Sequence, residues 1–305
     1  MENKIKIIKR GEKEYPEQLC RLKNPPKELY CKGDLNILKS FSLAIVGARK
    51  CTDESFEYSK RLSYDLAKND ITIISGMALG IDTSAHEGAL EAAGKTIAVL
   101  GCGFNYIYPK SNRELYEKIL QNGGLIISEY DEKMPPLRPN FVQRNRIVAT
   151  LSSGVIVVEA GEKSGSIITA QNMKELNGKV FAVPGSVFDE NFKGNNMLLK
   201  NGAILILDYK DVLKEFENIT IKEVEEKEEI QIPEEYFKIY NCIKGTPQDA
   251  NQISRKLNMP IAFINSELTT MEIERIYKRI ARKIILCQNI TKICYILCVA
   301  CHFHL

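Results

Sequence analysis

The sequence predicts an α/β protein with a doubly wound, Rossmann-like, mostly parallel sheet, followed by a small C-terminal helical module of degenerate winged-helix-like type. Short apolar runs recur between residues 43 and 207 without polar alternation, which is typical of strands covered on both faces. Helix-like segments separate these runs, and Gly94, Gly123 and Gly178 stand where helices should end. Both observations indicate repeated strand–helix units.

The elements are expected in a regular order along the chain. The expected strands are LAIV at 43–46, ITII at 71–74, TIAVL at 96–100, LII at 125–127, VIVV at 155–158, VFAV at 180–183 and AILIL at 203–207. The helices expected between them are 54–68, 83–93, 113–121 and 167–176. A short helix near 17–22 and a strand-like ELYCKG precede the first of these units, with Pro25 and Pro26 barring helix continuation.

Shifts in composition predict the domain organisation. The run KEVEEKEEIQIPEE is typical of a linker, and three short helices are expected after it. No wing hairpin is recognisable behind those helices. The predicted divisions are an N-terminal appendage at 1–40, a Rossmann-like domain at 41–213, an acidic linker at 214–235, an incomplete winged-helix-like module at 236–278 and an atypical cysteine-rich tail at 279–305.

Charge and hydropathy limit the possible partners. The net charge of +3 is only mildly basic, so a nucleic-acid site must be a local patch. The N-terminus has no signal-peptide core, and no clean run of roughly 20 apolar residues occurs. We therefore expect a cytoplasmic protein that does not bind a membrane.

The nine cysteines do not predict a metal centre. Those in the main body lack CxxC spacing and are expected to be small buried hydrophobic residues. The others crowd into the tail beside two histidines, but their spacing matches no zinc module, so no metal is expected.

The stretch from Leu137 to Gln171 is the strongest candidate for a binding site. An arginine-rich segment around an aromatic residue leads through an apolar strand into a Ser/Gly loop that opens a helix. A helix N-terminus attracts anions, and Arg and Phe add charge pairing and a stacking surface. The pattern predicts a polyanion that carries bases, although Phe141 could instead anchor a helix in the core. The candidate residues are Arg138, Phe141, Arg144, Arg146, Ser164, Gly165 and Ser166.

Two further loops follow expected strands, at the sheet edge where doubly wound folds bind ligands. Gly47 and Arg49 follow the first strand, although Gly47 could simply form the turn. Gly76, Gly80 and Asp82 lie in SGMALGIDTSAHEGAL, which resembles a phosphate-binding loop without its Gly-Lys-Ser/Thr. Asp82 is expected to cap the helix and fix the loop rather than to act in catalysis.

A third loop carries the aromatic residues of FNYIYPK. Packing of Tyr106 and Tyr108 is favoured slightly over ligand contact. His86 is expected to be structural more than a base, and Glu159 is the one strongly placed carboxylate near the Ser/Gly loop.

Motifs of known catalytic chemistry are missing. The chain has no HExxH, GxSxG or two-metal carboxylate set, so catalytic residues are not expected, and without GxGxxG neither is a dinucleotide cofactor. One alternative is a nucleotide-processing Rossmann-like enzyme of the phosphoribohydrolase type, although the PGGxGTxxE signature is absent. Another is a regulatory protein that binds DNA through its C-terminal module.

Several motifs occur in a specific order. They are GAR at 47–49, SGMALGIDTSAHEGAL at 75–90, VLGCGFNYIYPKSN at 99–112, NFVQRNRIVATLS at 140–152, VVEAGEKSGSIITA at 157–170 and VFAVPGSVFDENFKGNNMLLKNGA at 180–203. This set closely resembles the DNA-processing protein A family, also called DprA or Smf, over roughly residues 14 to 213. Relatives usually carry Pro-Arg where this chain has Val142 and Gln143, so one positive charge is absent.

The resemblance implies a non-catalytic protein that binds single-stranded DNA, forms a homodimer and helps to load the RecA recombinase on incoming DNA during natural transformation. Carried over by motif, Arg49 is expected to bind phosphate, Arg138 to add charge along the backbone and Phe141 to stack on a base. The loops at Gly76–Asp82 and Ser164–Ser166 are expected to line the same pocket.

Overall fold

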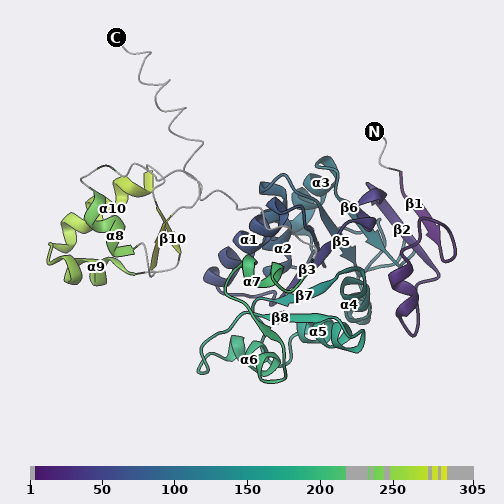
Figure 1. Ribbon diagram of the computed structural model, residues 1–305. Coiled ribbons are helices and arrows are strands. Elements are labelled where there is room, and N and C mark those ends of the chain that lie inside the picture. The colour runs from purple at the N-terminus through teal and green to yellow at the C-terminus, as the bar shows by residue number, and fades with distance from the viewer. Residues whose placement is uncertain are drawn as a thin grey trace, which may run out of the picture. The chain divides into compact units, whose positions relative to one another are not determined.

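A computed structural model describes residues 4–217, 233, 236–243, 248–273, 277–280 and 283–286 (Figure 1). The chain divides into two compact units, Met1–Val224 and Glu225–Leu305. Most of the predicted acidic linker and the predicted tail from residue 287 onward lie outside the described residues.

The first unit is built on a nine-stranded sheet in the order β1-β2-β6-β5-β4-β3-β7-β8-β9. The pairs from β6 across to β9 are parallel, and β1 and β2 add antiparallel pairs at one edge, so the predicted fold class is confirmed. The strands are β1 (Lys6–Lys9), β2 (Glu28–Gly33), β3 (Ser42–Val46), β4 (Thr72–Ser75), β5 (Thr96–Leu100), β6 (Leu125–Ser128), β7 (Gly154–Val157), β8 (Lys179–Ala182) and β9 (Ile204–Leu205).

The N-terminal residues contribute two of these strands, β1 and β2, so they extend the main sheet. The strand β1 has no counterpart among the expected elements. Its sequence is KIIK, and only Ile8 is buried, so it lacks the continuous apolar run that marked the inner strands.

Helices cover both faces of the sheet (Figure 1). Alternate residues of β3 enter opposite clusters: Ala44 packs with α4 and α5, whereas Ile45 packs with α1 and α2. This burial on both faces is why the strand is apolar throughout. The helices are α1 (Asp53–Lys68), α2 (Ile81–Glu91), α3 (Arg113–Gln121), α4 (Arg138–Leu151), α5 (Gly165–Glu175), α6 (Lys193–Lys200) and α7 (Tyr209–Leu213), with short 3-10 turns at Glu17–Arg21, Leu35–Lys39, Lys110–Asn112 and Glu190–Phe192.

The direction of winding reverses beside β3. The chain proceeds from β3 through β4 and β5 to β6, and then crosses back to place β7 on the other side of β3. In doubly wound sheets, ligands bind outside the carboxyl ends of the strands at such a switch point. The loops after β3, β4, β5 and β7 all reach this edge.

The second unit contains α8 (Phe237–Ile243), α9 (Ala250–Leu257) and α10 (Ile261–Ile273), followed by an antiparallel hairpin of β10 (Tyr277–Ile280) and β11 (Lys283–Leu286). The hairpin corrects the expectation that no wing follows the helices, and it crosses the predicted boundary at 278. Residues 281 and 282 are Ala-Arg rather than Asn-Gly or another pair that marks a hairpin, so the sequence carried no turn signal. Among the described residues, no helix is long and apolar enough to span a membrane.

Candidate functional site

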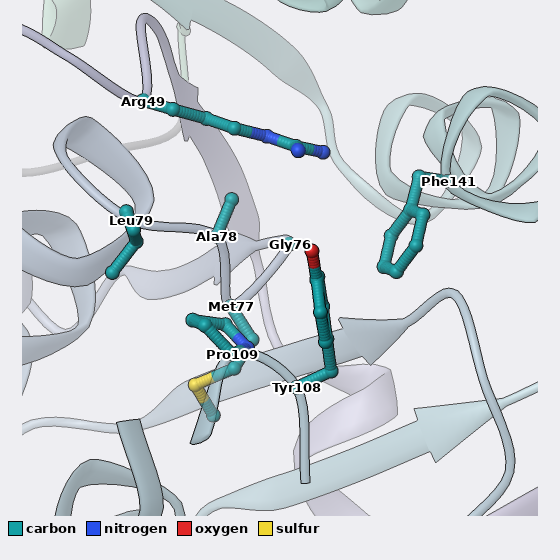
Figure 2. Close-up of a pocket in the computed structure, with 8 residues that line it drawn as sticks. All are labelled: Arg49, Gly76, Met77, Ala78, Leu79, Tyr108, Pro109 and Phe141. Carbon is teal, nitrogen blue, oxygen red and sulfur yellow. The ribbon is translucent and has the colours of Figure 1, made fainter. Parts of the chain in front are cut away.

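A small pocket lies where three strand-end loops meet the first turn of α4 (Figure 2). It holds about 320 Å³ of empty space, part of which is open to solvent. The loop after β3 contributes one side chain, the loop after β4 a run of four residues, and the loop after β5 two. The lining residues are Arg49, Gly76, Met77, Ala78, Leu79, Tyr108, Pro109 and Phe141.

One wall of the pocket combines a cation with two aromatic rings. The ring of Phe141 lies 5.1 Å from that of Tyr108 between centroids, at an interplanar angle of 41°. The Cζ atom of Arg49 lies 5.6 Å from the centroid of Phe141. Arg49 is exposed and Phe141 half-buried, so both are open to a ligand. A Cβ atom at Gly101 would lie 2.6 Å from Cδ1 of Phe141, so the ring has room only because that residue is glycine.

Phe141 therefore lies half-buried at the pocket, in the first turn of α4, rather than in the core. Pro139 fits that turn, where backbone N–H groups lack helical partners in any case. Tyr108 was not among the predicted site residues, yet it lines the pocket and is 43% exposed. The signal was available in the alternation of aromatic residues with Lys110 after a strand end.

Arg144 lies on the same helix but points inward, beneath the pocket. It is buried, and its Nη1 donates to the carbonyl oxygens of Gly76 and Val99. A Cβ atom at Gly76 would lie 2.4 Å from Cζ of Arg144, so the loop can approach the guanidinium only through glycine. The sequence-based expectation that Arg144 contacts DNA needs correction, because its donors already hold the protein backbone.

Asp82 is buried as well and supplies a negative charge that interacts with Arg144. Its Oδ2 accepts the backbone N–H groups of Gly76 at 3.1 Å and Ala78 at 3.3 Å, which fixes the loop as expected. The expectation that Asp82 caps the helix is wrong, because the N-cap of α2 is Gly80 and Asp82 lies within the helix. Burial raises the pKa of Asp82, and the charge of Arg144 opposes that rise. Burial likewise lowers the pKa of Arg144, against the stabilising charge of Asp82. The two groups thus share a site that is unfavourable for either charge alone.

Arg146 is also engaged within the protein. Its Nη2 pairs with Oε2 of Glu129, and the two side chains are only 16% and 9% exposed. The prediction that Arg146 binds DNA is corrected for the same reason as that for Arg144. Arg49 and Arg138 are exposed, and neither has a hydrogen bond or ion pair to its side chain within the described part of the chain. Arg138 opens α4, whose first turn contains no acidic residue.

The Ser/Gly loop forms the start of α5 and does not line the pocket. Ser164 caps the helix, with its Oγ 3.4 Å from the backbone N of Ser166 and 2.7 Å from the Ser166 Oγ. Asn145 on α4 donates to the carbonyl oxygen of Gly165 at 3.0 Å. The pocket at Phe141 is lined by residues of Gly76–Asp82 and by none of Ser164–Ser166, and Asn145 joins α4 to the start of α5.

Gly47 and Gly80 are required by close backbone contacts. A Cβ atom at Gly47 would lie 2.5 Å from the side chain of Ile81. Gly80 has a φ of +74°, and a Cβ atom there would lie 2.3 Å from the carbonyl oxygen of Ala48. These contacts hold the loop after β3 against α2, which sets the position of Arg49.

Glu159 anchors the other side of that loop. It is fully buried, and its Oε2 accepts the backbone N–H of Thr52 at 2.9 Å and the Thr52 hydroxyl at 2.8 Å. Its backbone oxygen accepts the N–H of Ala48 at 2.7 Å. The carboxylate thus joins the β3 and β7 ends at the switch point.

His86 is a core residue. It is fully buried with Nδ1 2.7 Å from the Thr96 hydroxyl, and burial, aided by the charge of Arg144, lowers its pKa to about 3. Its imidazole is therefore neutral at pH 7. Cys20 is exposed, which corrects the expectation that the main-body cysteines are buried. Within the described residues, no three His, Cys, Asp or Glu side chains are placed to hold a metal.

Comparisons with known proteins single out one family. The model of the DNA recombination-mediator protein A family matches residues 6–217. The DNA processing protein DprA of Streptococcus pneumoniae is 43% identical over 203 residues, which are 67% of this chain and 71% of that protein. Protein Smf of Escherichia coli is 41% identical over 200 residues, which are 66% of this chain and 54% of that protein.

Two solved structures of DNA processing protein A are also similar to this chain. The crystal structure of DNA processing protein A from Streptococcus pneumoniae is similar with a TM-score of 0.67 at 41% identity, covering 70% of this chain and 75% of that one. The DNA processing protein A of Helicobacter pylori, a structure described for its single-stranded DNA binding mode, has a TM-score of 0.63 at 35% identity and covers 70% of this chain and 97% of that one.

Proposed function

The chain belongs to the DNA recombination-mediator protein A family, and from this premise we propose that it binds single-stranded DNA at the pocket of Arg49 and Phe141. The main support for this proposal is that an exposed guanidinium and an accessible aromatic ring lie together in one open pocket. The pocket lies at the carboxyl ends of the strands, where the direction of winding of the sheet reverses. A ring stacks on any base, and a guanidinium adds attraction to a polyanion.

The shape of the site favours single strands over a duplex. A base must leave its neighbours to lie against Phe141, and in a duplex that step carries the additional cost of unpairing. A flexible single strand offers its bases without this cost. Arg138 supports the same proposal, because a cation at the positive end of a helix is unfavourable unless an anion compensates it.

The second part of the proposed function concerns a recombinase as protein partner. We propose that the bound strand is passed to a RecA-type recombinase, which is loaded on incoming DNA during natural transformation. The motivation is the family membership, since nothing in the pocket itself identifies a protein partner. A pull-down of the full chain with purified RecA, in the presence and absence of single-stranded DNA, tests this part, and a lack of any interaction contradicts it.

We further propose that the protein acts as a homodimer. A group of exposed apolar side chains supports this, because they come from one short segment around α6 and β9, the edge strand of the sheet. An exposed apolar edge is typical of an interaction surface. The residues are Val187, Phe188, Met197, Leu205 and Leu207. Light scattering of the wild type and of Leu205→Glu is expected to give a dimer and a monomer, respectively.

No catalytic role is proposed. The phosphoribohydrolase alternative needs an accessible carboxylate near a nucleotide, and Glu159 is fully buried with its Oε2 engaged by Thr52. If nucleotide hydrolysis occurred and was abolished by Glu159→Gln, the alternative would regain support.

The direct test is fluorescence anisotropy with labelled single- and double-stranded oligonucleotides and the full chain. We expect tighter binding of the single strand, and weaker binding by Arg49→Ala and Phe141→Ala. Phe237→Ala removes an exposed aromatic side chain from the second unit and serves as the control. Unchanged affinity in both pocket variants contradicts the site, and a loss confined to Phe237→Ala would favour DNA binding through the C-terminal module.

A further inference from the structure

Positive charge is concentrated at the start of the chain. Residues 1–28 contain eight Lys and Arg residues against five Glu residues, whereas residues 29–305 contain 34 basic and 34 acidic residues. The net charge of +3 therefore comes entirely from the first 28 residues. In a chain that is only mildly basic as a whole, a polyanion site depends on such a local excess.

The stretch that carries this charge projects from the carboxyl edge of the parallel strands. Strand β1 ends at Lys9 and β2 begins at Glu28, and these two residues are register partners. Tyr30 of β2 pairs with Ser128, the last residue of β6, so residues 10–27 leave and re-enter the sheet at that edge. The loops after β4 and β5 form the pocket at the same edge. Figure 1 shows β1 and β2 beside β6.

Two hydrogen bonds hold the turn after β1 against the segment that precedes β2. The N–H of Arg10 donates to the carbonyl oxygen of Lys27 at 2.9 Å, and the Tyr15 hydroxyl donates to that of Pro26 at 2.7 Å. Basic residues from both segments are thereby brought together, and all of them are exposed. They are called the basic patch and comprise Lys9, Arg10, Lys13 and Lys27.

The basic patch is not neutralised by ion pairs within the described residues. Glu14 pairs instead with Lys6 at 3.1 Å, and Glu12 accepts the backbone N–H of Lys9 at 3.0 Å. None of the four basic side chains has an ion pair or a hydrogen bond to another described residue. Like charges held on adjoining turns repel one another, and a bound polyanion would relieve that repulsion.

The segment that carries the basic patch packs on α4, the helix that also supplies Phe141 to the pocket. Leu19 lies in one core cluster with Ile147 of α4. Burial raises the pKa of Tyr15 to about 12, and the charges of Arg10 and of Arg146 on α4 both oppose that rise. The basic patch and the pocket are therefore connected through one helix.

The surface of α4 offers a path for a strand that leaves the pocket. The helix contains no acidic residue, and Arg138 at its start is exposed. Asp131 and Glu132 follow β6 and disfavour a path straight along the sheet edge, because they repel phosphates. Four strand steps separate β4 from β1, which is about 19 Å at a spacing of about 4.8 Å. Single-strand-binding folds cover about 4–16 nucleotides, so one strand can reach both regions.

We propose that the basic patch binds the phosphate backbone of single-stranded DNA as the strand leaves the pocket, and so lengthens the site without reading bases. This inference rests on the proposed binding of single-stranded DNA and adds a second contact region on the N-terminal strands. The patch consists only of Lys and Arg, so its contribution should be independent of sequence and should fall with salt. It should also require a strand long enough to reach from the pocket to β1.

Removal of three of these charges in Arg10→Gln/Lys13→Gln/Lys27→Gln tests the inference. Two labelled oligothymidylates, about 4 and about 16 nucleotides long, are titrated by fluorescence anisotropy. We expect the patch variant to bind the long strand about tenfold more weakly, with the slope of log affinity against log salt reduced by about 2 for three lost contacts. Its affinity for the short strand should stay within about twofold of the wild type, because that strand fills only the pocket.

The matched control is Lys39→Gln/Lys68→Gln/Lys200→Gln. These exposed lysines lie shortly before β3, β4 and β9, at the opposite edge of the sheet. The control removes the same charge as the patch variant, and it is expected to bind both strands as the wild type does.

Three results overturn the inference: unchanged affinity of the patch variant for the long strand, an equal loss on both strands, or an equal loss in the control variant. A loss confined to a duplex of the long length also overturns it, because the patch would then belong to double-stranded DNA. Failure of the wild type to bind either strand contradicts the proposed function itself, and the inference with it.

Discussion

Arg49 and Arg144 both lie next to the loop Gly76–Leu79, and only one of them faces solvent. Arg144 is buried beneath the loop and donates to the carbonyl oxygens of Gly76 and Val99. Arg49 is exposed above it and lies over Phe141. The comparison shows that access to solvent, and not residue type, decides which arginine shapes the site and which can contact a ligand. The two sides should respond differently to substitution.

The largest effect is expected on the buried side. Arg144→Ala should lower the free energy of unfolding by about 3–5 kcal/mol, because two buried carbonyls lose their donor and Asp82 loses its compensating charge. Urea denaturation followed by circular dichroism measures this.

Arg49→Ala is the matched control for that loss. As an exposed residue, it should change the free energy of unfolding by no more than about 0.5 kcal/mol. Equal effects of the two substitutions would remove the distinction between a buried and an exposed arginine.

The next effect concerns affinity on the exposed side. Phe141→Ala should weaken binding of single-stranded DNA by about 1–3 kcal/mol, the usual contribution of one stacked base. Its free energy of unfolding should fall by only about 1 kcal/mol, because the ring is half-buried. Anisotropy titration and urea denaturation of the same preparation separate the two quantities. If Phe141→Ala loses affinity only because it unfolds, the prediction is contradicted.

The pH dependence of the free energy of unfolding tests a second buried residue, His86. His86 has a folded-state pKa of about 3, below the ordinary 6.5, so the unfolded chain binds more protons between these values. Its contribution to stability is complete above pH 6.5 and is lost as pH falls toward 3. Between pH 6.5 and 5.5 the free energy of unfolding should fall by about 1 kcal/mol from this group.

The comparison variant is His86→Asn, measured by urea denaturation at each pH. Its stability should be less dependent on pH across that interval, whatever its absolute value. Parallel pH profiles for the variant and the wild type would show that His86 does not titrate as its buried position requires.

The smallest effect is expected on the salt dependence of the affinity for single-stranded DNA. If Arg138 binds one phosphate, Arg138→Ala should reduce the slope of log affinity against log salt by about 0.7, the value for one contact to a single strand. Arg49→Lys should leave the slope unchanged, because it retains the charge. Anisotropy titrations at several salt concentrations measure both, and an unchanged slope for Arg138→Ala contradicts a phosphate contact.

Much of the fold followed from local patterns. Each strand expected between 43 and 207 is present, because burial on both faces requires continuous apolar residues. Helix α4 was not expected, since its buried face includes Arg144 and it lacks a clean apolar stripe. The hairpin β10–β11 was not predicted, because residues 281 and 282 are not a pair that marks a hairpin turn. The family resemblance, which depends on ordered motifs, is confirmed.

The sequence by itself determined the fold class, the family and the loops that reach the sheet edge, because periodicity and motif order are local properties of the chain. Only the tertiary structure decided which candidates face the pocket. Arg144 and Arg146 are engaged inside the protein, Ser164–Ser166 does not line the pocket at Phe141, and Tyr108 joins Phe141. The physical reason is that a side chain's partners are set by neighbours distant in sequence. For Arg144, the carbonyls of Gly76 and Val99 are such neighbours, and no local pattern encodes them.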